Sequence, residues 1–203
     1  RGSGMIAVID YGAGNLFSVR NALDFLGIES EVTRDEEEIR KADGLILPGV
    51  GAFPDAMEML SKSGLADTIR EEAVKKPFLG ICLGMQMLFE ESTEFRQTEG
   101  LGLLRGTVDW IRSPYKIPHM GWNSLQFAKK SPLLEGVDEG AYVYFVHSFQ
   151  AYPAEEDLSA FCDYRTRIPA LVERGTVFGA QFHPEKSGDI GLTILRNFGR
   201  LTR

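Results

Sequence analysis

Short apolar runs alternate with amphipathic segments in the first half of the chain. The apolar runs predict buried strands at 5–9, 29–33 and 44–47 and in the run that begins at Pro77. Helices are predicted between them, from Leu16 to Leu26 and at 35–41, 54–60 and 65–74. Strands that alternate with helices are typical of βαβ units, so we expect a mostly parallel sheet with right-handed crossovers.

The second half of the chain is dominated by strand patterns and turns. Strands are predicted at 101–104, 107–111, 121–127, 141–152, 158–164, 169–173 and 176–182. Several suit antiparallel pairing, notably the last two, which a turn at Arg174 and Gly175 joins. A final helix begins near Ser187 and has an apolar stripe at Ile194, Leu195, Phe198 and Leu201. We therefore expect an α/β fold, with an open, mostly parallel sheet flanked by helices and an added antiparallel part.

Composition and charge add a few limits on the number of domains, the partners and the compartment of the protein. The 203 residues suit a single domain at 5–203, and residues 1–4, which precede Met5, are expected to be a tag remnant. A net charge of −7 argues against a general nucleic-acid surface. The two cysteines have no metal-ligand spacing and indicate a reducing compartment. No apolar run is long enough to span a bilayer, so we expect a cytoplasmic protein without a metal or membrane contact.

Cys82 lies where an apolar run meets a helix-like pattern. Gly80-Ile81-Cys82-Leu83-Gly84 has the form of the strand–turn–helix elbow that presents a nucleophile. Such a turn strains the backbone, and the two glycines leave room for it. The Leu83 amide would face a developing oxyanion. The alternative is a buried core cysteine, because free cysteine is among the most buried residue types.

Two glycine-rich turns follow predicted strands in the first half. The turn at 10–15 could cradle a phosphate, but it lacks the G-x-G-x-x-G and Gly-Lys-Ser/Thr patterns, so a simple tight turn is the favoured reading. The turn at 48–51 is either a plain connection or the source of a second oxyanion donor. Both turns are expected at the sheet edge where sites gather in open α/β folds.

His183 is the best candidate for a general base among the three histidines. It ends an alternating strand, and Glu185 follows at i+2, where an extended chain faces the same side. Glu185 could orient the ring, and neutral His183 could then take the proton of Cys82. His119 and His147 have no such carboxylate, so we expect them to be structural or binding residues. Cys162 is expected to belong to the core.

Three motifs together resemble those of the class I, or triad, glutamine amidotransferases. They are Pro-Gly-Val-Gly at 48–51, Gly-Ile-Cys-Leu-Gly-Met-Gln at 80–86 and Phe-His-Pro-Glu-Lys at 182–186, and the resemblance spans the chain from Met5. Stretches at 10–15, 118–123, 144–148 and 183–187 look like the glutaminase subunits of imidazole glycerol phosphate synthases. This resemblance implies hydrolysis of L-glutamine without a cofactor, and transfer of the ammonia to a (β/α)8-barrel cyclase in a heterodimer of histidine biosynthesis.

The resemblance also implies roles for individual residues. Cys82, His183 and Glu185 would form the catalytic triad, and Val50 and Leu83 would offer oxyanion amides, with Gly49 leaving the Gly49–Val50 peptide free to turn over. Glutamine would contact Gly51, Gln86, Glu94, Ser148 and Phe149. The partner face would include Trp122, Asn123, Tyr144 and Lys186. The family resemblance further implies that the subunit is quiet until the cyclase binds its own ligand.

Rival interpretations stay open at this point. The same scaffold serves other glutaminase subunits, such as one that feeds pyridoxal phosphate synthesis, although the stretch at 118–123 argues against it. A thiol peptidase or γ-glutamyl hydrolase would need a larger cleft than any pattern marks. A non-catalytic binding subunit would not need an intact triad, and a nucleotide-binding flavodoxin-like module would depend on 12–15 and not on Cys82.

Overall fold

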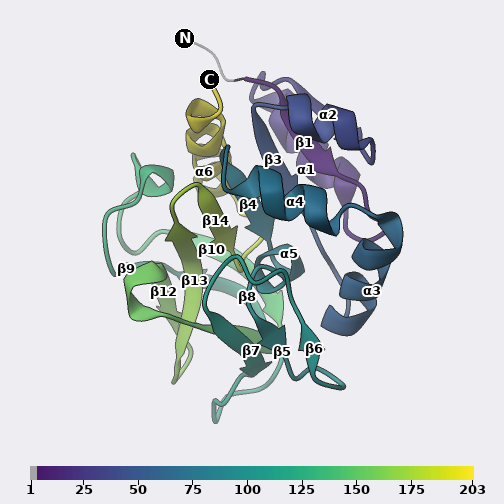
Figure 1. The fold of residues 1–203 in the computed structure, drawn as a ribbon. Helices are drawn as coiled ribbons and strands as arrows, with labels where there is room; N and C mark the ends of the chain where they lie inside the picture. The colour runs from purple at the N-terminus through teal and green to yellow at the C-terminus, as the bar shows by residue number, and fades with distance from the viewer. Residues whose placement is uncertain (1–3) are drawn as a thin grey trace.

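The computed structural model describes residues 4–203, and its centre is an eight-stranded sheet (Figure 1). The strands follow the order β2 (Ser30–Thr33), β1 (Ile6–Ile9), β3 (Gly44–Leu47), β4 (Phe78–Ile81), β14 (Val177–Ala180), β13 (Arg167–Arg174), β12 (Leu158–Asp163) and β9 (Gln126–Phe127). Neighbours from β2 to β14 pair in parallel, and those from β14 to β9 pair antiparallel. The expected mostly parallel sheet with an added antiparallel part is confirmed.

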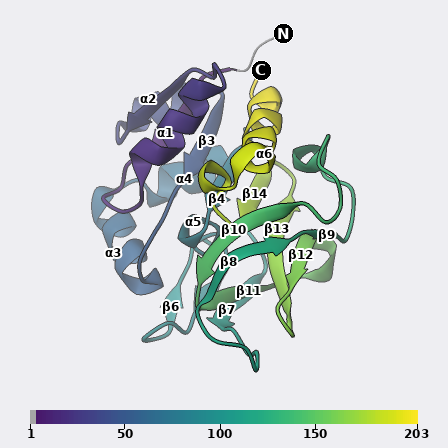
Figure 2. The same cartoon turned by 180° about the vertical axis from the view of Figure 1, so that it is seen from behind.

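Helices cover both faces of the parallel half (Figures 1 and 2). The helices α1 (Leu16–Phe25) and α6 (Gly188–Leu201) lie on one face, and α2 (Glu36–Lys41) and α4 (Ala66–Ala73) lie on the other. Ile6 and Val8 of β1 belong to the hydrophobic core under α1 and α6, whereas Ala7 and Ile9 belong to the core on the opposite face. Because both faces are covered, the strand is apolar at every position. The helix α3 (Phe53–Ser63) follows the turn after β3.

Two smaller sheets extend the antiparallel half. One is a ribbon of β8 (His119–Ser124) and β10 (Tyr142–His147). The other contains β11 (Phe149–Pro153), β7 (Gly106–Trp110), β5 (Glu91–Ser92) and β6 (Thr98–Glu99). The strand predicted at 141–152 is therefore two strands, because the chain passes from one sheet to the other at Ser148. The strand predicted at 121–127 likewise divides between β8 and β9.

The prediction of a strand at 101–104 is wrong. The amide of Leu101 donates to the carbonyl of Met87 at 2.8 Å, and those of Leu103 and Leu104 donate to Leu88 at 2.8 and 2.9 Å. These backbone groups therefore bond to the turn that follows the nucleophile segment, and not to a neighbouring strand. Leu101 and Leu104 are buried there, which explains their apolar pattern.

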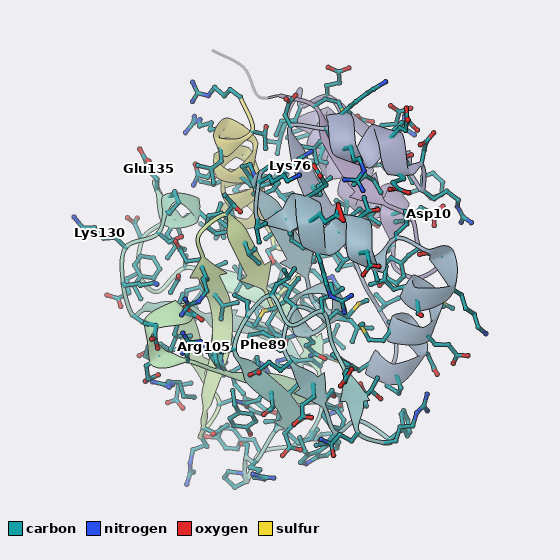
Figure 3. The ribbon with its side chains drawn as sticks, in the orientation of Figure 1. Asp10, Lys76, Phe89, Arg105, Lys130 and Glu135 are labelled. Atoms are coloured by element: carbon teal, nitrogen blue, oxygen red, sulfur yellow. The ribbon has the colours of Figure 1, made fainter. Side chains whose placement is uncertain are left out.

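Charged side chains lie at the surface, and large apolar ones fill the interior (Figure 3). Figure 3 shows Lys130 and Glu135 at the edge of the molecule and Phe89 in its interior. No helix within residues 4–203 is long and apolar enough to cross a membrane. Most of the predicted tag remnant at 1–4 lies outside the described residues.

Candidate active site

Cys82 occupies a sharp turn between β4 and the short helix α5 (Leu83–Gln86). Its backbone has φ 55° and ψ −114°, which is a strained conformation for a residue with a side chain. A Cβ atom on Gly84 would lie 1.9 Å from the carbonyl oxygen of Leu47, and one on Gly80 would lie 2.5 Å from that of Gly84. Close backbone approach therefore requires both glycines, and the chain has the elbow that their spacing predicts.

His183 reaches Cys82 from the neighbouring strand. β14 pairs in parallel with β4, with Ala180 opposite Ile81, so the residues that follow the two strands share one sheet edge. His183 and Cys82 line one pocket, and the Nδ1 atom of His183 lies 3.0 Å from Oε2 of Glu185. Because a carboxylate accepts hydrogen bonds, Nδ1 carries a proton and Nε2 is left for the sulfur. The three predicted triad side chains are thus together.

The charges of the triad support one another. Burial by itself lowers the pKa of His183, but the hydrogen bonds and charges of Cys82 and Glu185 outweigh burial and raise that pKa to about 9. The side chains of His183 and Glu185 are 5% and 2% exposed, so water screens these interactions weakly. At neutral pH His183 is therefore an imidazolium, a cation that lies beside the Cys82 sulfur in the same pocket.

Histidine NMR tests this protonation state directly. We expect one ring to titrate with a midpoint near pH 9, because the pKa of His183 is raised, and to be protonated at lower pH. The other two rings, His119 and His147, should stay neutral and silent above pH 6, because burial lowers their pKa values to about 4 and about 3. A spectrum in which no ring titrates above pH 8 would contradict the ion pair. In a Cys82→Ser variant the midpoint should fall, since the sulfur's contribution is lost.

A pocket of about 400 Å³ opens in front of Cys82 and His183. This volume suits a small ligand. All predicted oxyanion and glutamine-binding residues except Gly49 line it: Val50, Gly51, Leu83, Gln86, Glu94, Ser148 and Phe149. Gly49 lines a much smaller cavity behind the triad, together with Val50, His183 and Glu185.

Glu94 contributes a partly buried carboxylate to the pocket wall. Its Oε1 atom accepts a hydrogen bond of 2.9 Å from the amide of Phe53, at the start of α3. Burial raises the pKa of Glu94; the Phe53 bond opposes this change and the charge of Asp55 adds to it, and the net shift is upward. The backbone bond holds the carboxylate in place, where it could accept hydrogen bonds from a ligand ammonium group.

The predicted oxyanion loop is fixed by a residue that sequence reasoning missed. The hydroxyl of Tyr11 donates to the carbonyl of Pro48 at 2.8 Å. Burial, and then the nearby Cys82 sulfur, raises the pKa of Tyr11 above its ordinary value, so the hydroxyl remains a donor. A Cβ atom on Gly49 would lie 2.8 Å from the Gly84 amide nitrogen, so only glycine fits against the elbow here. A turnover of the Gly49–Val50 peptide stays a prediction.

The other two histidines form a buried hydrogen-bonded pair. Nδ1 of His119 lies 2.8 Å from Nε2 of His147, and Nδ1 of His147 lies 2.8 Å from the carbonyl oxygen of Phe149. Within the part of the chain that the structure describes, no carboxylate bonds to either ring, so neither resembles His183. Within residues 4–203, no three His, Cys, Asp or Glu side chains gather so that they could hold a metal ion.

The predicted partner face lies on the β8–β10 ribbon and beside it. Trp122 is 56% exposed, and its ring packs edge-on against Tyr144 with 5.9 Å between centroids. Lys186 is exposed on the turn after His183. The Asn123 amide is occupied within the protein, since it donates to Nε2 of His119 at 3.2 Å and to the carbonyl of Asp163 at 3.0 Å. Asn123 therefore supports the ribbon from within.

Known proteins share this sequence and fold. The family model for glutamine amidotransferase class-I matches residues 7–200. The imidazole glycerol phosphate synthase subunit HisH of Bacillus cereus (strain G9842) is 53% identical over 96% of this chain and 93% of its own length. The corresponding subunit of Geobacillus kaustophilus is 55% identical over 96% of this chain and 95% of its own. PurLQS from Thermotoga maritima has a similar structure, with a TM-score of 0.77, 20% identity and 97% of each chain covered. The chain therefore belongs to the glutamine amidotransferase class-I family.

Proposed function

We propose that this chain is the glutaminase subunit of an imidazole glycerol phosphate synthase. It hydrolyses L-glutamine to glutamate and ammonia and delivers the ammonia to a cyclase subunit of histidine biosynthesis. The observation that supports the hydrolytic step is that Cys82 and the hydrogen-bonded His183–Glu185 pair meet at one pocket of suitable size. Relatives of that name, each more than half identical over nearly the whole chain, support the pathway role.

The first half-reaction acylates Cys82. The thiolate attacks the side-chain carbonyl carbon of glutamine, and the amides of Leu83 and Val50 stabilise the oxyanion that forms. The carbon–nitrogen bond then breaks, and the His183 imidazolium gives its proton to the departing ammonia. A raised pKa at His183 suits this step, because the proton is already in place at neutral pH.

The second half-reaction releases glutamate. His183 is now neutral and takes a proton from water, which attacks the γ-glutamyl thioester. The carbon–sulfur bond breaks and the thiolate–imidazolium pair is restored. Glu185 keeps the proton of His183 on Nδ1 throughout, so Nε2 is the atom that exchanges protons.

The proposed partner is a (β/α)8-barrel cyclase that docks on Trp122, Tyr144 and Lys186. These residues gather beside the segment that carries His183, and Trp122 is a large exposed aromatic side chain of the kind that dominates interfaces. A partner docked there would lie close to the oxyanion loop, which lines a small cavity together with His183. Production of ammonia would then depend on the presence of its acceptor.

The test is ammonia release from glutamine by the chain alone, with a cyclase subunit, and with the cyclase plus its nucleotide ligand. We expect the liganded complex to exceed the isolated chain by about 10²–10³-fold, the range that one oxyanion donor supplies. Equal rates of ammonia release in all three samples would show that glutamine hydrolysis is not coupled to the cyclase. A Trp122→Ala variant should lose the increase while keeping the basal rate, whereas Phe25→Ala, which changes an exposed aromatic side chain at the end of α1, should keep both.

A further inference from the structure

One backbone carbonyl beside the pocket fixes the orientation of a buried side-chain network. The carbonyl oxygen of Phe149 lies 2.8 Å from Nδ1 of His147 and 3.0 Å from Nε2 of Gln86. A carbonyl can only accept hydrogen bonds, so His147 carries its proton on Nδ1 and Gln86 presents its amino group. This assignment needs no assumption about any other side chain.

The orientation of Gln86 determines that of Gln181. Nε2 of Gln86 also lies 3.0 Å from Oε1 of Gln181, so Gln181 accepts there and its own amino group points away. That amino group lies 3.8 Å from the sulfur of Cys82. If the Gln181 amide were reversed, two amino groups would face each other. That contact is repulsive, so the network allows one orientation.

Gln181 has no other reason to be polar. Its side chain is fully buried, and among the described residues 4–203 it forms hydrogen bonds only with Gln86 and Cys82. A buried amide is costly unless both of its ends are satisfied, and here the second end is satisfied by the sulfur. A hydrogen bond to a charged acceptor is stronger than one to a neutral acceptor.

We infer that Gln181 is a catalytic residue that stabilises the Cys82 thiolate by donating an N–H to its sulfur. The role of the thiolate in glutamine hydrolysis rests on the proposed function, but its stabilisation does not. The Cys82 sulfur also lies 4.0 Å from the backbone carbonyl oxygen of Val146. The titratable groups near this sulfur or in its pocket, besides the His183–Glu185 pair, are Tyr11, His147 and Glu94. His147 is neutral and Tyr11 stays protonated, so neither titrates near neutral pH in competition with His183.

A second chain of hydrogen bonds, through His147, His119 and Asn123, holds the Phe149 carbonyl in place. His147 accepts from Nδ1 of His119, and Nε2 of His119 accepts from Asn123. The Phe149 carbonyl is therefore held from the β8–β10 ribbon on one side and by Gln86 on the other. A change in the ribbon would reach the sulfur through Phe149, Gln86 and Gln181.

The experiment measures alkylation of Cys82 by iodoacetamide as a function of pH, in wild type, Gln181→Met and Gln181→Glu. Cys162 is fully buried, and burial raises its pKa to about 12, so the rate reports Cys82. We expect Gln181→Met to move the midpoint of the profile up by about one pH unit and to slow alkylation about tenfold below it. Gln181→Glu keeps the bond to Gln86 and replaces only the donor by an acceptor, so its midpoint should move further.

Gln150→Met is the matched control. Gln150 is another buried glutamine, but its amide donates to the backbone carbonyl of Arg167, away from the sulfur. Its profile should match wild type. Thermal unfolding of each variant establishes that it is folded. If Gln181→Met does not fold, Gln181→Glu still tests the inference. Alkylation profiles of the folded Gln181 variants that superimpose on wild type would overturn the inference. Because the measurement needs neither glutamine nor a cyclase, it is decided separately from the proposed function.

Discussion

Cys82→Ser should lower the rate of glutamine hydrolysis by about 10⁴-fold or more. The serine hydroxyl fits the elbow, whose backbone strain and neighbouring glycines do not depend on the sulfur. However, a hydroxyl does not ionise near neutral pH, so no anion remains to pair with His183. The measurement is glutamate formation in the liganded complex, together with covalent labelling by a glutamine-like chloroketone, which should also disappear.

Cys162→Ser is the control for this substitution. Cys162 is the only other cysteine in the sequence, and it is buried in β12. Its replacement removes a buried thiol without touching the pocket, so turnover should stay within a few-fold of wild type and only stability should fall. A Cys82→Ser variant that kept a tenth of wild-type turnover would exclude Cys82 as the nucleophile.

The parallel half of the fold could be predicted from local sequence patterns, because each strand and helix there has its own pattern of apolar residues. A strand covered on both faces must be apolar throughout, as in β1, and each of these strands is followed by a turn and a helix. The antiparallel half is harder, since sheet membership is decided by pairing partners. Alternation continues across Ser148, although β10 and β11 join different sheets, and the buried residues Leu101 and Leu104 belong to a turn.

The proposed triad could be predicted because its residues belong to two short motifs that follow neighbouring parallel strands. The residues that contact the triad and the oxyanion loop could not be predicted in this way, because their contacts exist only in the folded chain. Tyr11 bonds to Pro48, 37 positions away, and Gln181 bonds to Cys82, 99 positions away. One signal could have pointed to Gln181: it lies two residues before His183 in a segment whose sequence pattern predicts an extended chain, which would put both on the same face, although β14 itself ends at Ala180.

Glu185→Gln should lower glutamine turnover by about 10³–10⁴-fold while leaving the fold intact. The amide is nearly the same shape as the carboxylate but can turn its NH₂ group toward Nδ1 of His183. That contact favours the tautomer in which Nε2 keeps its proton, so the neutral ring can no longer accept one from water. The loss should therefore appear in the rate constant and far less in the KM for glutamine, because the pocket wall is unchanged.

The same variant should also change the titration of His183. The carboxylate is one of the groups that raise the pKa of this ring to about 9, so its neutralisation should move the NMR midpoint downward, toward the ordinary value for histidine. Glu135→Gln, which removes an exposed carboxylate far from the pocket, should move neither the rate nor the midpoint. If Glu185→Gln kept both, the 3.0 Å contact with His183 would be a packing contact, and another group would have to orient the ring.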